Sequence, residues 1–300
     1  MQNAYRSGIV AVVGRPNVGK STLVNVLVGQ KISITSRRPQ TTQQRILGIK
    51  TSDRYQIVYV DTPGIHPSTG RKLNKVMNKS AIGSLYGVDC IVFMITAKGW
   101  TESDEQVLEI LRGHKTPIVL AINKLDTLES KEYLMPLIQE SNKKEGVVFT
   151  EIIPLSAKKR INVEELENIL LSFLPEQDKL FPEDQVSDRS DKFMAAELIR
   201  EQIFHIIGQE VPHAVAVGIE TFKLEKNIIR VEAVIWVEKS GQKGILIGKN
   251  GEKLKRIGTE ARKEMEKLFG SKVYLNLWVK VRENWRDSDR ALRTLGFGED

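Results

Sequence analysis

The chain has 300 residues, of which 41% are hydrophobic and 28% are charged, so it can form packed cores and has the charge content of an ordinary globular protein. The single cysteine, Cys90, excludes a disulfide framework, and the absence of any apolar run of about eighteen residues excludes a membrane-spanning helix. The chain enters its first expected strand by about Gly8, so we expect no signal peptide and a cytoplasmic location. The length predicts two domains.

The formal charge of +7 is unevenly distributed. Residues 1–175 carry 23 Lys and Arg against 16 Asp and Glu, whereas residues 176–300 carry 22 of each class. In the second part, Lys239–Lys267 holds nine cations and four carboxylates, and Glu176–Asp191 holds six carboxylates and two cations. A basic stretch beside an acidic one says more about partners than the total charge does.

Apolar runs alternate with helical patterns through the first half of the chain. We expect strands at Ile9–Val13, Tyr55–Val60, Asp89–Thr96, Pro117–Ile122 and Thr150–Leu155, and helices at Ser21–Gly29, Leu73–Leu85, Ser103–Leu111, Tyr133–Lys144 and Val163–Phe173. This alternation predicts an α/β fold with a doubly wound, mostly parallel sheet. We place this first domain at residues 1–175, and the acidic, proline-containing segment 176–191 is expected to be a linker.

Residues 192–300 predict a second, small α/β domain with a C-terminal tail. We expect a helix, two strands, a short helical turn, a long helix and a last strand at Phe193–Ile207, Ala214–Thr221, Ile228–Glu238, Ile245–Ile247, Glu252–Phe269 and Val273–Val281. The expected order is therefore α-β-β-α-α-β.

The first motif along the chain matches G-x-x-x-x-G-K-[ST], the phosphate-binding P-loop, at Gly14-Arg15-Pro16-Asn17-Val18-Gly19-Lys20-Ser21. It lies between an expected strand and an expected helix, as this loop requires. Main-chain N–H groups and the helix N-terminus would face a polyphosphate, Lys20 would reach the outer phosphates, and Ser21 would ligate Mg²⁺.

Two further motifs select the base. Asp126, in Asn123-Lys124-Leu125-Asp126, would accept two hydrogen bonds from guanine, and adenine offers no such pair of donors. The main-chain N–H groups of Ser156-Ala157-Lys158, after another expected strand, would meet guanine O6. Together these motifs predict a GTP site.

Two loops would respond to the γ-phosphate. In Asp61-Thr62-Pro63-Gly64, Asp61 suits a water-mediated contact with Mg²⁺ and the Gly64 N–H suits the γ-phosphate. Either Thr41 or Thr42 would offer a hydroxyl to Mg²⁺, unless this polar stretch is only a solvated loop. We expect the residues that carry hydrolysis to be Lys20, Thr42, Asp61 and Gly64, with the metal held by Ser21, Thr42 and Asp61.

The stretch Gly248-Lys249-Asn250-Gly251 predicts close approach to a nucleic-acid backbone. G-x-x-G is a weak signal by itself, but here it separates a short helical turn from a long helical pattern, which excludes a hairpin at Asn250-Gly251. Bases would lie against an aliphatic surface, and we expect RNA contacts from Ile245, Ile247, Gly248, Lys249, Asn250, Gly251, Lys253, Leu254 and Trp285. Trp236 and Trp278 lie on apolar strands and are expected in the core.

The nucleotide motifs resemble the five signature motifs of translation-factor-related GTPases. That superfamily usually orients the attacking water with a Gln where this chain has Ile65, so the resemblance implies slow intrinsic hydrolysis. Asn17 is similar to the asparagine with which potassium-activated members hold K⁺; it could equally only shape the loop.

The second domain, with Ile-Gly-Lys-Asn-Gly at residues 247–251, resembles a type II KH domain, a module that clamps single-stranded RNA. A KH-like domain can instead contact protein. The combination is similar to the Era family of bacterial GTPases, and the distinctive stretches are Ser36–Thr42, Leu180–Asp184 and Leu277–Arg286. Gln43 stands where that family usually has Arg, which leaves a phosphate role for this side chain in doubt.

The resemblance implies a Mg²⁺-dependent, monomeric GTPase whose GTP form holds the single-stranded 3′ end of small-subunit ribosomal RNA during assembly of the small subunit. It also implies association with the immature small subunit and a peripheral contact with the inner face of the membrane. The alternative is a signalling or membrane-associated GTPase whose second domain contacts protein.

Overall fold

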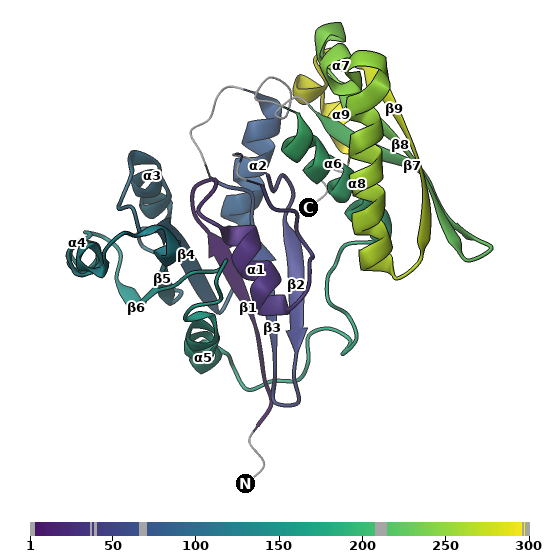
Figure 1. Ribbon diagram of the computed structural model, residues 1–300. Coiled ribbons are helices and arrows are strands. Elements are labelled where there is room, and N and C mark those ends of the chain that lie inside the picture. The colour runs from purple at the N-terminus through teal and green to yellow at the C-terminus, as the bar shows by residue number, and fades with distance from the viewer. Residues whose placement is uncertain are drawn as a thin grey trace. The chain divides into compact units, whose positions relative to one another are not determined.

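The computed structural model describes residues 4–36, 38, 41–65, 71–207, 215–295 and 297 (Figure 1). The chain forms two compact units. The first consists of Met1–Ser33, Pro39–Thr69 and Met77–Asp188, and the second of Ile34–Arg38, Gly70–Val76 and Arg189–Asp300. None of the described helices is long and apolar enough to cross a lipid bilayer.

The first unit contains a six-stranded sheet of order β2-β3-β1-β4-β5-β6. Its strands are β1 Arg6–Val13, β2 Ile46–Thr51, β3 Tyr55–Asp61, β4 Cys90–Thr96, β5 Ile118–Asn123 and β6 Phe149–Pro154. All neighbouring strands pair in parallel except β2, which pairs antiparallel with β3. The expected α/β fold with a mostly parallel sheet is confirmed, and β2 is the strand that the sequence analysis missed.

Helices α1 Lys20–Val28, α2 Lys72–Gly83, α3 Glu102–Leu111 and α4 Leu134–Asn142 connect these strands, and α5 Val163–Phe173 follows β6. Every residue of β4 and β5 is buried, as expected for central parallel strands covered on both faces. The carboxyl ends of parallel strands meet at one edge of the sheet, where ligands of such folds bind. The loops that follow β1, β3, β5 and β6 therefore converge there.

The acidic segment after α5 follows the sheet of the first unit. The side-chain oxygen of Gln56 in β3 accepts the N–H groups of Leu180 and Phe181 at 2.8 and 2.9 Å. The N–H of Ile49 in β2 donates to the carbonyl of Val186 at 2.9 Å. The first compact unit thus extends to Asp188, beyond the expected domain limit at residue 175.

The second unit has the expected order α-β-β-α-α-β. Its elements are α6 Asp191–Ile206, β7 Ala216–Glu225, β8 Ile228–Val237, α7 Ser240–Ile247, α8 Glu252–Phe269 and β9 Lys272–Val281, followed by α9 Asp289–Thr294. The central strand β8 pairs antiparallel with β7 and parallel with β9. Apolar residues of the helices, including Leu198, Ile257 and Met265, pack in one cluster with those of the sheet.

Candidate GTP site and nucleic-acid groove

The P-loop connects the end of β1 to the start of α1, and its two glycines are required by space and backbone geometry. Gly14 and Gly19 have φ values of +151° and +109°. A Cβ on Gly14 would lie 2.5 Å from the carbonyl oxygen of Met94, and one on Gly19 would lie 2.3 Å from Nδ2 of Asn123. These close approaches bring the end of β4 and the N-K-x-D motif against the loop.

Lys20 lies at the first position of α1 and is buried. Its Nζ donates to the main-chain carbonyls of Gly14 at 3.0 Å and Arg15 at 3.1 Å. Burial lowers the pKa of Lys20 to about 8, and Asp61 opposes this effect while Arg15 adds to it. The ammonium group is thus held within the P-loop, where it can serve an anionic ligand.

Three oxygen-bearing side chains meet beside Lys20. Oγ of Ser21 and Oγ1 of Thr42 are 2.6 Å apart, and Thr42 Oγ1 lies 3.4 Å from Oδ2 of Asp61. Asp61 is buried, and among the described residues its Oδ1 has no hydrogen-bond partner. Burial raises the pKa of Asp61, which hydroxyl contacts and Lys20 counteract.

This oxygen set fits Mg²⁺, which prefers carboxylate and hydroxyl ligands and neutralises a buried carboxylate. The hydroxyl of Thr42 touches that of Ser21. Within the described ranges, no cluster of three or more His, Cys, Asp or Glu residues offers another metal site.

The segment after β3 packs against the P-loop. Oγ1 of Thr62 donates to the carbonyl of Val12 at 2.8 Å. Gly64 is close enough to Pro16 that a Cβ would lie 2.8–2.9 Å from the Pro16 ring and main chain. Ile65, the residue after Gly64, is buried in the apolar cluster between sheet and helices. An aliphatic side chain in that cluster has no group with which to orient water.

The base-selecting motifs are brought together by Asn123. Its Nδ2 donates to the carbonyl of Val18 at 2.8 Å, and its Oδ1 accepts the N–H of Ala157 at 3.0 Å. Lys124 has a φ of +68° and reaches the Asn17 carbonyl with its Nζ at 2.5 Å. One residue therefore links the P-loop, the end of β5 and the loop after β6.

Asp126 is exposed, and Oγ of Ser156 lies 2.5 Å from its Oδ1. The geometry leaves the outward part of the carboxylate available to guanine. The N–H groups of Ser156 and Ala157 are already engaged, by Ile161 and Asn123 respectively. The expected donation of N–H groups from Ser156, Ala157 and Lys158 to guanine O6 therefore stays a prediction.

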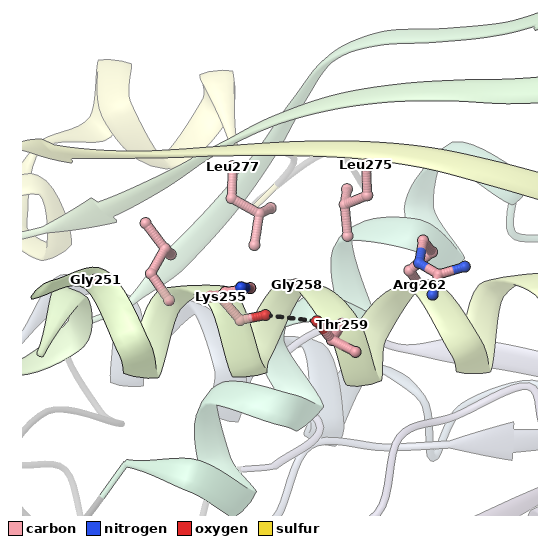
Figure 2. A pocket seen from close by; sticks show the side chains of 8 residues that line it. Gly251, Lys255, Gly258, Thr259, Arg262, Leu275 and Leu277 are labelled. Carbon is pink, nitrogen blue, oxygen red and sulfur yellow. Dashed lines mark hydrogen bonds between the residues drawn. The ribbon is translucent and has the colours of Figure 1, made fainter.

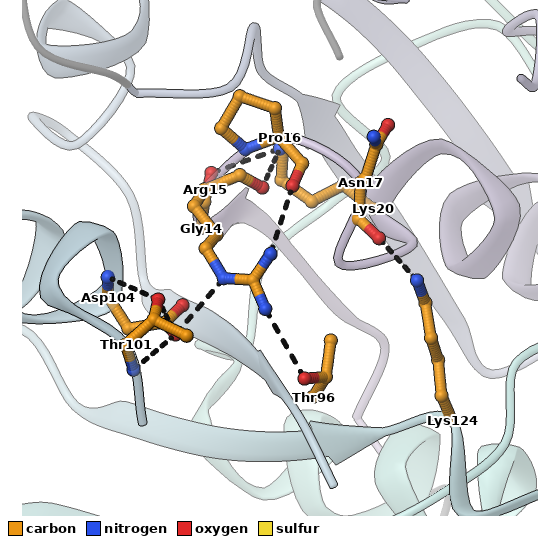
Figure 3. A network of polar contacts seen from close by, with 9 residues as sticks. All are labelled: Gly14, Arg15, Pro16, Asn17, Lys20, Thr96, Thr101, Asp104 and Lys124. Carbon is orange, nitrogen blue, oxygen red and sulfur yellow. Dashed lines mark hydrogen bonds and ion pairs between the residues drawn. The ribbon is translucent and has the colours of Figure 1, made fainter. Parts of the chain in front are cut away.

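The structure adds residues that no motif signalled. The guanidinium of Arg15 reaches Asp104, at the N-terminus of α3, and Thr96, at the end of β4 (Figure 3). Asp104 lies 89 positions and Thr96 lies 81 positions from Arg15 along the chain. No local pattern could have identified them, because the contact depends on β4 pairing with β1.

In the second unit, a groove of about 390 Å³ lies between α8 and β9 (Figure 2). Two glycines, three leucines and three polar side chains line it. They are Gly251, at the start of α8, and Gly258; Leu254, Leu275 and Leu277; and Lys255, Thr259 and Arg262. Gly258 lets α8 approach β9, since a Cβ there would lie 3.3 Å from the Leu277 side chain. An apolar floor with cations at its edge suits unpaired bases and phosphates.

The G-x-x-G loop lies between two helices, α7 and α8, as expected. Gly248 and Gly251 have φ values of +72° and +78°, and Asn250 between them has +52°. Lys249 and Lys253 are exposed, whereas Ile245 and Ile247 are partly buried and pack against the core of the second unit. Of the expected RNA contacts, Gly251 and Leu254 line the groove.

Two expectations about tryptophans are wrong. Trp285 was expected to contact RNA at the surface, but it is fully buried and stacks on Phe297 with 6.5 Å between ring centroids. Trp278 was expected in the core, but it is 43% exposed. Trp236 is partly buried, with Lys280 and Arg282 over its ring.

Comparison with known proteins agrees with this geometry. A family described as 50S ribosome-binding GTPase matches residues 9–124, and a KH domain family matches residues 210–286. GTPase Era of Marinobacter nauticus is 54% identical over 98% of this chain and 96% of its own length. GTPase Era of Coxiella burnetii (strain Dugway 5J108-111) is 53% identical over 97% of this chain and 98% of its own length.

Two crystal structures superimpose on nearly the whole chain. One is of Era in complex with MgGDPNP and nucleotides 1506–1542 of 16S ribosomal RNA, with a TM-score of 0.94, 40% identity and coverage of 97% and 99% of the two chains. The other is of an Aquifex aeolicus Era variant bound to GDP·AlF4⁻, with a TM-score of 0.93, 41% identity and the same coverage.

Proposed function

The chain belongs to the Era family of GTPases, and from its groove we propose that its GTP-bound form holds the single-stranded 3′ end of small-subunit ribosomal RNA. The observation that carries this proposal is the groove between α8 and β9, which is lined by two glycines, three leucines and the cations Lys255 and Arg262. The related Era chain of known structure was crystallised with 16S ribosomal RNA nucleotides 1506–1542.

Hydrolysis of GTP would use the residues that meet at the carboxyl edge of the sheet. Lys20 would move from the carbonyls of the P-loop to the phosphates, and Asn123 would hold the loop in shape. Mg²⁺, held by Ser21, Thr42 and Asp61, would bind phosphate oxygens and stabilise the negative charge that develops on them. Because Ile65 has no polar group, we expect slow hydrolysis in the isolated protein.

K⁺ is proposed as a second cation near Asn17, whose main chain is already fixed by Lys124. A monovalent cation near the β- and γ-phosphates would supply charge that other GTPases take from an arginine. Equal hydrolysis rates in K⁺ and Na⁺ would exclude this role and leave Asn17 as a residue that shapes the loop.

The nucleotide and the RNA are expected to influence each other's binding. Thr42 and Gly64 belong to loops that contact the γ-phosphate in this proposal, so GTP and GDP would favour different arrangements of these loops. If GTP increases the affinity for RNA, RNA must increase the affinity for GTP by the same factor. The larger target would be the immature small ribosomal subunit, and a peripheral membrane contact stays a prediction from the family resemblance.

The test is binding of a fluorescent oligonucleotide with the sequence of the small-subunit rRNA 3′ end, in the presence of a GTP analogue, GDP or no nucleotide. We expect tight binding with the analogue that weakens steeply with salt, because phosphate contacts release counterions. The variants Lys249→Glu and Gly251→Asp should lose binding in every nucleotide state.

The matched control is Lys223→Glu, which makes the same charge change at an exposed position of β7, on the sheet and outside the groove lining. Its RNA affinity should stay close to that of the wild type. Weak binding that is equal in all states and unaffected by Lys249→Glu would reject the RNA proposal. The second unit would then be assigned to a protein partner.

A further inference from the structure

We propose that Asp104 is a positioning residue for nucleotide binding, which fixes the P-loop through the side chain of Arg15. Nε of Arg15 donates to Oδ2 of Asp104 at 3.1 Å, and Nη2 donates to Oγ1 of Thr96 at 3.3 Å (Figure 3). Nη1 reaches the carbonyl of Pro16, the next residue of the loop, at 3.5 Å. The guanidinium thus ties the P-loop to β4 and α3.

Asp104 is a rigid anchor for this contact because α3 begins around it. It is completely buried, and its Oδ2 also accepts the N–H of Thr101 at 3.0 Å and the Thr101 hydroxyl at 2.7 Å. The N–H of Asp104 donates back to Thr101 Oγ1 at 3.4 Å, which completes a capping box. A buried carboxylate held at this many points cannot follow Arg15 if the loop moves.

The main chain of Arg15 forms part of the phosphate-binding machinery. Its carbonyl accepts a hydrogen bond from Nζ of Lys20 at 3.1 Å. Pro16, which follows, is the residue on which Gly64 packs. Fixing the Arg15 side chain therefore fixes both the acceptor of Lys20 and the surface beneath the D-x-x-G loop.

Charge gives Asp104 a second effect on the loop. Arg15 and Lys20 are like charges in one loop, and Asp104 offsets the first of them with a buried carboxylate. Removing only the carboxylate would leave the guanidinium partly buried without its ionic partner, and it would be free to rotate toward solvent. The loop would then sample arrangements that do not bind phosphate, which lowers the apparent affinity for any guanine nucleotide.

The experiment compares Asp104→Asn, Arg15→Gln and the double variant in the full chain. We expect each single variant to raise the dissociation constants for GDP and for a GTP analogue by about tenfold, and the double variant to raise them no further. The turnover number at saturating GTP should stay within about twofold of the wild type, because a preformed loop affects ground state and transition state alike. Arg15→Lys should restore part of the affinity.

The matched control is Glu109→Gln in the same helix. The Glu109 carboxylate pairs with Arg112 at 2.9 Å on the exposed face of α3, away from the P-loop contact. This variant should bind nucleotide like the wild type. Dissociation constants are fitted with the active fraction as a variable, so loss of folded protein does not imitate loss of affinity.

The proposal fails if the double variant is weakened by the product of the two single effects, since Asp104 would then act without Arg15. It also fails if affinity is unchanged, or if GTP binding is lost while GDP binding is kept, which would place Arg15 at the γ-phosphate. If Asp104→Asn does not fold, the dissociation constants of Arg15→Gln and Arg15→Lys for GDP and the GTP analogue test the proposal instead. None of these results depends on RNA, so they leave the proposed RNA function to its own test.

Discussion

The side-chain amide of Asn123 donates to the main-chain carbonyl of Val18 at 2.8 Å. The same side chain accepts the N–H of Ala157, so it joins the P-loop to the loop after β6. Asn123 is 2% exposed, and both of its partners are completely buried. The N-K-x-D motif therefore supports the phosphate site as well as the base site.

Asn123→Ala should weaken GTP and GDP binding equally, because it leaves the Val18 carbonyl and the Ala157 N–H unpaired in the protein interior. Each unpaired buried group costs about 1–3 kcal/mol, so we expect a loss of affinity of roughly ten- to a hundredfold, together with a lower melting temperature. Titration with fluorescent GDP and GTP analogues measures the affinities. Asn142→Ala, at an exposed position at the end of α4, is the control.

Gly64→Ala should weaken binding of a GTP analogue more than binding of GDP. A Cβ on Gly64 would lie 2.8–2.9 Å from Pro16, so the D-x-x-G loop must move away from the P-loop. If the Gly64 N–H binds the γ-phosphate, only GTP loses a contact, and a charge-assisted hydrogen bond of about 1.5–3 kcal/mol predicts a loss of roughly ten- to a hundredfold.

The control for this variant is Gly83→Ala at the end of α2, where an added Cβ would meet no atom within 4 Å. It should leave both affinities unchanged. Equal loss of GTP and GDP affinity in Gly64→Ala would show that Gly64 serves the shape of the P-loop and not the γ-phosphate.

The fold class and the nucleotide motifs could be predicted because their signals are local. A P-loop is recognisable from the spacing of Gly14, Gly19 and Lys20, since the backbone geometry of the loop requires those residue types. The contact of Arg15 with Asp104 could not be predicted in this way. It exists because β1 and β4 are neighbours in the sheet, which the sequence does not specify residue by residue.

The C-terminal end of the chain also could not be predicted from local sequence patterns. The α9 segment Asp289–Thr294 is too short to give a periodic apolar pattern, so the sequence analysis treated the region as a tail. Burial of Trp285 beside Phe297 and the apolar residues Ala291 and Leu292 follows from tertiary packing. The strand β2 was missed because the apolar run that forms it is only a few residues long.

Substitution of the two tryptophans should destabilise the protein to different extents. Trp285→Ala should lower the free energy of unfolding by about 3–5 kcal/mol, because it removes a large, fully buried side chain that stacks on Phe297. Trp278→Ala should lower it much less, since this side chain is 43% exposed. Thermal unfolding followed by circular dichroism measures both. A Trp285→Ala protein as stable as the Trp278→Ala protein would contradict the burial.

Nucleotide affinity should depend on pH through Lys20, whose pKa burial lowers to about 8. The phosphates of a bound nucleotide favour the charged amine, so the pKa must be higher in the complex than in the free protein. Binding is therefore independent of this group below about pH 8. Above that pH the free protein must take up a proton to bind, and the affinity should fall by up to about tenfold per pH unit until the pKa of the complex is reached.

Titrations with GDP from about pH 7 to about pH 10 test this dependence. Guanine also loses its N1 proton in alkali, so Lys20→Arg, which keeps its charge throughout the range, is the control. The arginine variant should bind more weakly but show only the pH dependence of the base. If it loses affinity with pH as steeply as the wild type, then Lys20 does not titrate near pH 8, and its ammonium group is already stabilised by Asp61 and the P-loop carbonyls.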